Sequence, residues 1–201
     1  MKEHYYEKLL NINTRGKQKE VTVSTHYFPY EPTPYADLEV LFSTYKLKNS
    51  DRIVDFGCGK GRLHFFINYF YDASVVGVEM NEILYQEAIE NRNRYLKKMK
   101  KGKDKLHFHC CLAEEYPIDP LDNRFYFFNP FSIQIFRNII NNILSSVNQS
   151  KRNIELILYY GSEDYTYFLE NDTSFELIEE IPLPFYERDS SERFLIYRLN
   201  F

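Results

Sequence analysis

A glycine-rich turn is the first place in this sequence where residue types and spacing could do chemistry. Gly57, Gly59 and Gly61 follow the hydrophobic run IVDF and precede an apolar stretch with helical spacing. Glycines placed between a strand and a helix let the backbone approach a ligand where any Cβ would intrude. The pattern predicts a site for a nucleotide-like cofactor, and an ordinary strand-to-helix turn is the alternative.

The charge beside this turn favours a cationic cofactor. Asp55 stands just before the first glycine, where it would repel the pyrophosphate of a dinucleotide and attract the sulfonium and ammonium groups of S-adenosylmethionine. The spacing Gly-x-Gly-x-Gly also departs from the dinucleotide pattern Gly-x-Gly-x-x-Gly. Glu79 ends the next hydrophobic run, about 20 residues beyond the turn, where an acid accepts hydrogen bonds from ribose hydroxyls. A strand-end Glu in a surface ion pair is the alternative.

Strand-like and helix-like stretches alternate along the chain, which is typical of a parallel sheet covered by helices. Strands are expected at 52–56, 74–78, 106–112, 125–128 and 154–160, and helices from about residue 34 and over 63–70, 82–100 and 133–147. Two further strand-like stretches, 175–181 and 194–200, are separated by a loop too short for a crossover helix. They are therefore expected to pair antiparallel.

Length and composition fit one folded domain without disulfides. The chain has 201 residues, of which 44% are hydrophobic and 27% charged. Its net charge of -4 provides no general positive field for a polyphosphate backbone, so bulk nucleic-acid binding is not expected. No stretch is long and apolar enough to span a membrane, and the charged first ten residues do not resemble a secretory signal. A cytoplasmic protein with reduced cysteines is expected.

The motifs VDFGCGKGR and VVGVEMN, together with the order of the elements, resemble the class I, Rossmann-like S-adenosylmethionine-dependent methyltransferases over about residues 33–201. The resemblance implies an α/β fold with a doubly wound, mostly parallel seven-stranded sheet that ends in an antiparallel hairpin. It also implies an aromatic-rich cap or lid over residues 1–34 and a methyltransferase domain over 35–201. The residues that would bind the cofactor are Thr33, Asp55, Gly57, Cys58, Gly59, Gly61, Glu79, Met80, Ala113, Glu114 and Asn129.

The fourth predicted strand ends in NPFS, which is similar to the Asn-Pro-Pro-aromatic motif of amino-group methyltransferases but short by one proline. In those enzymes the Asn side chain and a prolyl carbonyl accept hydrogen bonds from the target nitrogen while the aromatic ring stacks on it. Carried over, Asn129 is the catalytic, substrate-orienting residue, and Pro130 and Phe131 bind substrate. A strand-to-helix turn with Pro near the helix start is the alternative. Tyr30, one of the aromatic residues near the N-terminus, is also expected to bind substrate.

Aromatic residues near the N-terminus, and the segment 161–167 after the fifth strand, could also meet substrate. The aromatic residues are Tyr5, Tyr6, Tyr27, Phe28, Tyr30 and Tyr35. They could cover a planar or cationic group, and core packing of a leading helix is the alternative. The segment 161–167 is expected at the sheet edge where α/β proteins bind ligands.

The residues as a whole predict an S-adenosylmethionine-dependent methyltransferase acting on a nitrogen or oxygen of a small molecule or protein. A non-catalytic module that binds S-adenosylmethionine as a sensor is the alternative. An NAD-dependent oxidoreductase is a third hypothesis, against which Asp55 and the glycine spacing argue. His107, His109 and Cys111 share one face of a predicted strand, but no fourth ligand lies nearby, so no metal site is expected.

Overall fold

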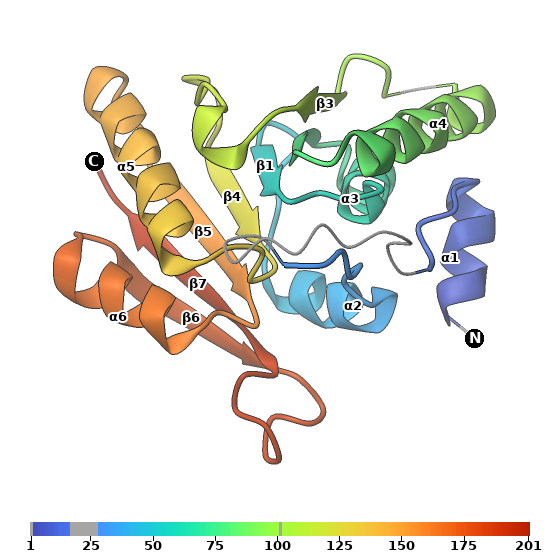
Figure 1. Cartoon of the computed structure of the whole chain (residues 1–201). Coiled ribbons are helices and arrows are strands. Elements are labelled where there is room, and N and C mark those ends of the chain that lie inside the picture. The colour runs from blue at the N-terminus through green and yellow to red at the C-terminus, as the bar shows by residue number, and fades with distance from the viewer. Residues whose placement is uncertain (1, 17–27, 101) are drawn as a thin grey trace.

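A seven-stranded sheet organises the chain (Figure 1). The structure is a computed structural model that describes residues 2–16, 28–100 and 102–201. The strands are β1 (Arg52–Phe56), β2 (Ser74–Glu79), β3 (Leu106–Cys110), β4 (Arg124–Phe127), β5 (Ile154–Tyr159), β6 (Glu176–Pro182) and β7 (Arg193–Leu199). Their order is β3-β2-β1-β4-β5-β7-β6, with β1 to β5 parallel and β7 antiparallel to both of its neighbours. The predicted fold class and the antiparallel hairpin are confirmed.

The strand order reverses beside β1, which places the predicted site at a topological switch point. From β1 the chain proceeds outward through β2 and β3, and it then returns to β4 on the other side of β1. Ligands of doubly wound sheets bind outside the carboxyl ends of the strands at this point. The glycine turn follows β1 and Asn129 follows β4, so the two predicted halves of the site come from neighbouring strands.

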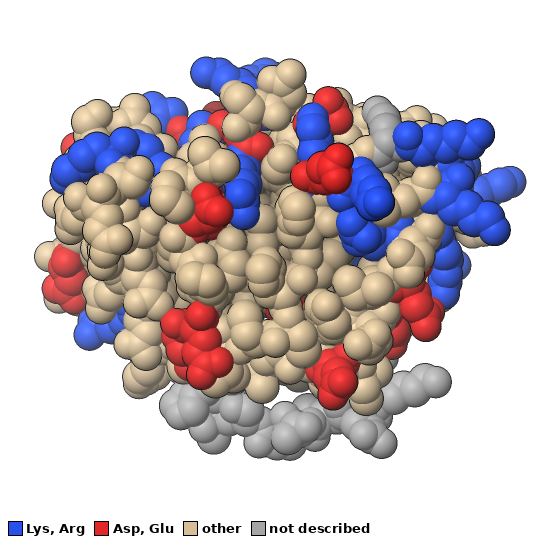
Figure 2. All heavy atoms as spheres, turned by 90° about the horizontal axis from the view of Figure 1, so that it is seen from above, with Lys and Arg blue, Asp and Glu red and all other residues tan. Residues whose placement is uncertain are grey.

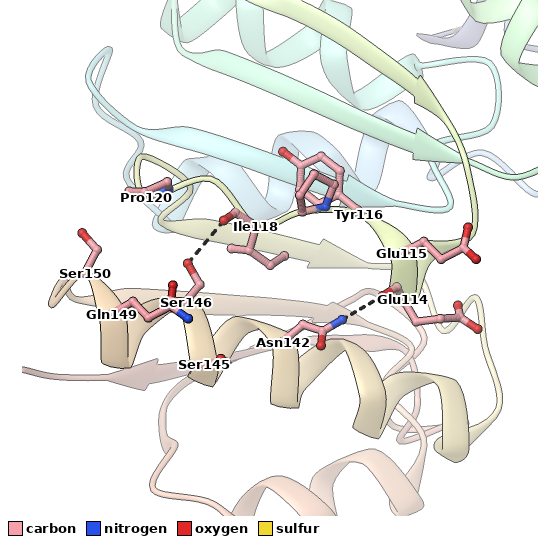
Figure 3. Close-up of a pocket in the computed structure, with 11 residues that line it drawn as sticks. Glu114, Glu115, Tyr116, Ile118, Pro120, Asn142, Ser145, Ser146, Gln149 and Ser150 are labelled. Atoms are coloured by element: carbon pink, nitrogen blue, oxygen red, sulfur yellow. Dashed lines mark hydrogen bonds between the residues drawn. The ribbon is translucent and has the colours of Figure 1, made fainter.

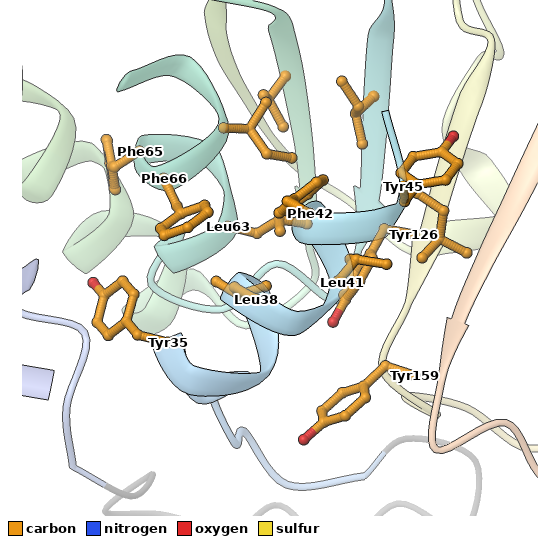
Figure 4. Close-up of a cluster of buried hydrophobic side chains, with 14 of the residues drawn as sticks. Tyr35, Leu38, Leu41, Phe42, Tyr45, Leu63, Phe65, Phe66, Tyr126 and Tyr159 are labelled. Carbon is orange, nitrogen blue, oxygen red and sulfur yellow. The ribbon is translucent and has the colours of Figure 1, made fainter. Parts of the chain in front are cut away.

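Helices cover both faces of the sheet, and a separate hydrophobic cluster lies between the helices and the sheet on each face. They are α1 (Lys2–Leu10), α2 (Tyr35–Thr44), α3 (Arg62–Tyr71), α4 (Glu82–Met99), α5 (Ile133–Gln149) and α6 (Glu163–Asp172), with a 3-10 turn η1 (Ala113–Glu115). One cluster joins α1, α2 and α3 to the sheet, and aromatic and leucine side chains fill it (Figure 4). The other lies beneath α5 and α6. Within the described residues, no helix is long and apolar enough to cross a membrane.

Two elements differ from the sequence prediction. Residues 163–172 form α6 where only a loop segment was expected; the Ser162 side chain caps it by accepting from the Tyr165 N–H, and Glu163 and Asp164 follow in the first turn. Strand β3 ends at Cys110 rather than at residue 112, because the chain turns there into η1. The other expected strands and helices agree with the structure to within one or two residues.

The N-terminal segment is joined to α3 by a buried network. Arg62 at the start of α3 makes ion pairs with Glu3 at 2.6 Å and Glu7 at 3.6 Å, and its Nε donates to the Thr14 hydroxyl at 2.8 Å. Tyr6 stacks on Tyr35 with ring centroids 4.7 Å apart, which is the core packing weighed against a lid for these aromatic residues. A separate cap over 1–34 stays a prediction, and Tyr27 lies outside the described residues.

Candidate active site

The glycine turn after β1 uses its own N–H groups internally. The N–H groups of Gly57 and Cys58 donate to the Val78 carbonyl at 2.9 and 3.1 Å, and the Gly59 N–H donates to the Glu79 carboxylate at 2.9 Å. Gly57 and Gly59 both have positive φ, at 83° and 53°. A dinucleotide site instead presents free N–H groups to the pyrophosphate. The backbone of this turn therefore does not suit a phosphate group.

Two buried carboxylates lie at the turn without a basic partner. Asp55 is 5% exposed and Glu79 is 7% exposed. Burial, and then the charge of Glu79, raise the pKa of Asp55 to about 8, and burial raises the pKa of Glu79. The cations of the turn pair elsewhere, Lys60 with Glu87 at 2.8 Å and Arg62 with the N-terminal carboxylates. Because no described Lys or Arg forms an ion pair with either acid, and the buried His64 beside Asp55 is neutral, the two carboxyl groups suit a ligand that brings positive charge, such as a sulfonium or an ammonium.

Residues from two other segments cover the turn. A Cβ placed on Gly59 would overlap the ring of Tyr30, and one placed on Gly57 would lie 3.0 Å from the Cβ of Pro130. The Tyr30 hydroxyl donates to the Thr14 carbonyl at 2.7 Å, which holds the ring there. The structure thus brings together the predicted cofactor glycines and two predicted substrate residues that lie far apart in the sequence.

The remaining predicted residues near the turn have structural contacts of their own. Gly61 begins α3 with a φ of 82°, and a Cβ there would lie 2.9 Å from the Phe108 ring. Burial raises the pKa of the Cys58 thiol well above its usual value, which keeps it protonated. The Thr33 hydroxyl lies 2.7 Å from the Tyr126 hydroxyl, and Met80 is exposed. Their roles toward the cofactor stay predictions.

The acceptor side is built from the ends of β4 and β5, where two non-glycine residues have left-handed backbone. Asn129 has a φ of 38° and Tyr160 a φ of 52°. Such strain costs free energy and occurs often at functional sites. The Pro130 carbonyl accepts the Phe28 N–H at 3.1 Å, and Phe131 is 4% exposed with its carbonyl accepting from the Tyr165 hydroxyl. Within the NPF motif, Asn129 and Pro130 are thus half-buried and Phe131 is buried, and substrate contact by Phe131 stays a prediction.

The predicted adenine residues, Ala113 and Glu114, begin η1 beyond β3. Ala113 is buried in the hydrophobic cluster that also holds Phe56 at the end of β1. Glu114 lines a pocket between the 114–120 segment and α5, where its carbonyl accepts from Asn142 at 2.8 Å (Figure 3). The pocket contains no other predicted site residue, so it is not the cofactor site inferred from the turn.

Sequence reasoning missed His64, which lies beneath the turn on α3. Its side chain is fully buried, and its Nδ1 lies 3.6 Å from the Asp55 carboxylate. A signal was present in the sequence: Gly77 interrupts the buried strand β2, and a glycine in a strand interior often marks close approach of another group. Tyr160 was also missed, and its place at a strand end is the only cue.

Comparison with known proteins agrees with this architecture. Residues 36–117 match a protein family described as "Methyltransferase domain". None of the curated proteins matches the chain. Three solved structures with a similar fold have identities of 10% to 14%. At this level the likeness concerns the fold.

Two of the three solved structures carry a substrate in their names, and the two substrates differ. An RNA methyltransferase from Salinibacter ruber, in complex with S-adenosyl-L-homocysteine, has a TM-score of 0.52 at 13% identity, covering 84% of this chain and 92% of its own. The human methyltransferase 10 domain containing protein has a TM-score of 0.59 at 10% identity, covering 98% and 93%. A geranyl diphosphate C-methyltransferase from Streptomyces coelicolor A3(2) has a TM-score of 0.56 at 14% identity, covering 83% and 78%.

These neighbours do not support the expectation that nucleic acid is excluded as a partner, because one of them acts on RNA. They also leave open which atom receives the methyl group. What they share with this chain is the fold. The chain therefore has the Rossmann-like fold seen in class I S-adenosylmethionine-dependent methyltransferases, and its residues 36–117 match a methyltransferase domain family.

Proposed function

We propose that this protein transfers the methyl group of S-adenosylmethionine to a nitrogen or oxygen atom of a small molecule or a protein. The observation that carries the proposal is the pair of buried acids, Asp55 and Glu79, at a turn whose N–H groups are already hydrogen bonded. Such a turn attracts a cation and offers little to a phosphate. We assign the methionine end of the cofactor to Asp55 and the ribose hydroxyls to Glu79, since a carboxylate keeps spare lone pairs after accepting two backbone N–H groups.

Asn129 is the residue that we assign to orienting the acceptor. The bound cofactor supplies a methyl group on a sulfonium, whose neutral thioether leaving group needs no proton, so the protein contributes mainly alignment. The Asn129 amide oxygen accepts a hydrogen bond from the acceptor N–H or O–H and directs its lone pair toward the turn. The left-handed backbone of Asn129, directly after β4, supports this assignment because such strain occurs often at functional sites. An acceptor nitrogen fits this single amide acceptor best.

We favour a small molecule or protein over a nucleic acid because of where the positive charge lies. Figure 2 shows lysine and arginine side chains gathered at the side of the molecule where α4 lies. Lys97, Lys98 and Lys100 are at the C-terminal end of this helix, whereas the cofactor acid Glu79 lies just before its N-terminal end. An 18-residue helix is about 27 Å long, so this positive surface is one helix length from the turn. In a titration we expect RNA to bind weakly, with an affinity that does not depend on these lysines.

A non-catalytic sensor is the second candidate, and the closed contacts around the acceptor motif favour it. The Pro130 carbonyl is occupied by the Phe28 N–H, and the motif lacks a second proline. In a sensor, these contacts would differ between the cofactor-free and cofactor-bound states, and a partner would recognise the difference. Cofactor binding without a methylated product from cell extracts would support this candidate.

Calorimetry with purified protein tests the cofactor assignment. S-adenosylmethionine should bind and NAD should not. Asp55→Ala and Glu79→Ala should each weaken binding, whereas Glu82→Ala, an exposed acid in the first turn of α4, should not. Binding of NAD alone, or unchanged affinity in both acid variants, would overturn the proposal.

A methyl-labelled cofactor tests the acceptor. Small-molecule, protein and RNA fractions of a cell extract are incubated with the protein, and labelled products are identified by mass spectrometry. We expect label on nitrogen or oxygen in the metabolite or protein fraction. Label confined to carbon, or to RNA, would contradict the acceptor class that we propose.

A further inference from the structure

His64 and Asp55 form a buried polar pair beneath the glycine turn. The side chain of His64 is fully buried, and neither ring nitrogen makes a hydrogen bond of ordinary geometry within the described residues, although the Val76 backbone lies close enough to act on the ring. Its Nδ1 lies 3.6 Å from the Asp55 Oδ2, just beyond hydrogen-bond range. Unsatisfied polar atoms in a core are rare and call for an explanation. Catalytic contacts are often long in the unliganded state and shorten in the complex.

The surroundings fix the imidazole in this place. Its ring stacks on Phe108 with centroids 4.5 Å apart and planes at 19°. A Cβ on Gly77 would lie 2.5 Å from the His64 Nε2 and 2.6 Å from the Cys58 Sγ, so a larger residue at 77 would displace the ring. In the sheet, Gly77 pairs with both Asp55 and Phe108. Glycine at this strand position thus provides the space in which the imidazole faces the carboxyl group.

We propose that His64 is a positioning residue for the cofactor acid Asp55, able to hydrogen bond the carboxyl group in both of its protonation states. A neutral Asp55 donates its proton to Nδ1, and an ionised Asp55 accepts an N–H from Nδ1. On ionisation the Asp55 O–H bond breaks and Nδ1 gains a proton, while Nε2 gives one up. One proton leaves the site and the imidazole stays neutral. The inference rests on the proposed role of Asp55 in binding a cationic cofactor.

The groups that face the pair explain why such a partner is useful. Burial, and then Glu79, raise the pKa of Asp55 to about 8, so a cation must compete with a proton at neutral pH. Burial lowers the pKa of His64 to about 3; His107 adds to this, and the Val76 backbone partly opposes it.

Two other titratable groups face the pair. These are the Cys58 thiol and the Tyr126 phenol, whose pKa values are raised by burial and, secondarily, by the charge of Asp55, so both are neutral. Every neighbour named here is therefore neutral or acidic. Among them, the imidazole of His64 has its Nδ1 3.6 Å from the carboxyl group, and in its neutral form it can donate to the ionised carboxylate.

The pH dependence of cofactor binding tests the proposal. For the native protein, affinity for S-adenosylmethionine should rise about tenfold per pH unit up to about pH 8 and then level off. Calorimetry in buffers of different ionisation enthalpy should detect release of about one proton per site. In His64→Leu, the pH at which the affinity for S-adenosylmethionine levels off should be about one pH unit higher, and binding at pH 7 should be about tenfold weaker.

Two variants separate positioning from packing. His64→Gln keeps a donor and an acceptor and should restore the native pH profile in part. Phe66→Leu alters packing of the same helix without contacting Asp55, and should lower the melting temperature without moving the profile. An unchanged profile in both His64 variants would overturn the proposal.

A carbon-13 NMR titration of the Asp55 carboxyl group without cofactor gives an independent readout. The midpoint of this titration should be higher in His64→Leu than in the native chain. If the midpoints differ but the protein does not bind the cofactor, the proposed function is rejected while the role of His64 toward Asp55 is supported. If His64→Leu does not fold, His64→Gln provides the comparison. Equal midpoints in the native and variant chains would reject the role of His64.

Discussion

The two halves of the site are held in place to very different degrees. On the cofactor side, the buried Arg62 makes ion pairs with the partly exposed Glu3 and the buried Glu7, and the Tyr30 ring packs directly on Gly59. On the acceptor side, the N-terminal segment contributes a backbone hydrogen bond from Phe28 to the Pro130 carbonyl. A common cofactor needs a fixed geometry, whereas the acceptor distinguishes one methyltransferase from another. The N-terminal segment therefore anchors the cofactor half through side chains, whereas it touches the acceptor half through a backbone hydrogen bond.

The largest effect should come from breaking the network of the cofactor side. Arg62→Ala leaves Glu7 buried without its cation, which costs about 3–5 kcal/mol of unfolding free energy. Urea denaturation measures this. Arg94→Ala removes an exposed pair with Glu90 and should cost about 0.3–0.5 kcal/mol. Equal losses in the two variants would show that the N-terminal segment is not anchored through Arg62.

The next effect should come from the acceptor side and appear in turnover. Asn129→Ala should lower kcat about 100-fold, as expected when a group that positions the reacting atoms is removed, and leave cofactor affinity unchanged. Kinetics with the identified acceptor and calorimetry with the cofactor measure the two quantities. Asn142→Ala, on α5 beside the pocket of Figure 3, is the control and should leave kcat unchanged. Loss of cofactor affinity in Asn129→Ala would move this residue to the cofactor half.

The buried acid Asp55 should make the fold less stable as pH rises. Its pKa is raised to about 8 in the folded protein, so between about pH 4 and pH 8 the folded state holds a proton that the unfolded state has lost. Unfolding free energy therefore falls with rising pH, by at most about 1.4 kcal/mol per pH unit. Asp55→Asn removes this dependence and should be increasingly more stable than the native chain as pH approaches 8. A constant difference across the range would mean that Asp55 ionises as an exposed acid does.

The smallest expected effect concerns backbone strain at Asn129. Asn129→Gly removes the cost of a left-handed φ and should raise unfolding free energy by about 1 kcal/mol while lowering kcat as the alanine variant does. Lys100→Gly, at the left-handed end of α4, should give a similar gain with kcat unchanged. Thermal unfolding and steady-state kinetics compare the two. A loss of stability in Asn129→Gly would mean that its side chain, and not its strain, governs the turn.

The fold was predictable because its signals are local. The strand at 52–56, the glycine turn and the helix after it form from neighbouring residues, and the prediction matched β1 to the residue. The short link between 175–181 and 194–200 excluded a crossover helix, which determined the antiparallel hairpin. Helix α6 was missed although Ser162 can cap it and its buried residues Tyr165, Phe168 and Leu169 have helical spacing, because this apolar pattern spans only one turn.

The sequence by itself determined the class of fold, the glycine turn and the acidic character of the cofactor site, because these depend on residues close together in the chain. Only the tertiary structure decided that Tyr30 covers Gly59, that Arg62 pairs with α1 and that His64 faces Asp55. These contacts join segments that pack together only when the sheet and its helices are complete. Burial in that core is also what raises the pKa of Asp55, because a carboxylate has its ordinary pKa only in water.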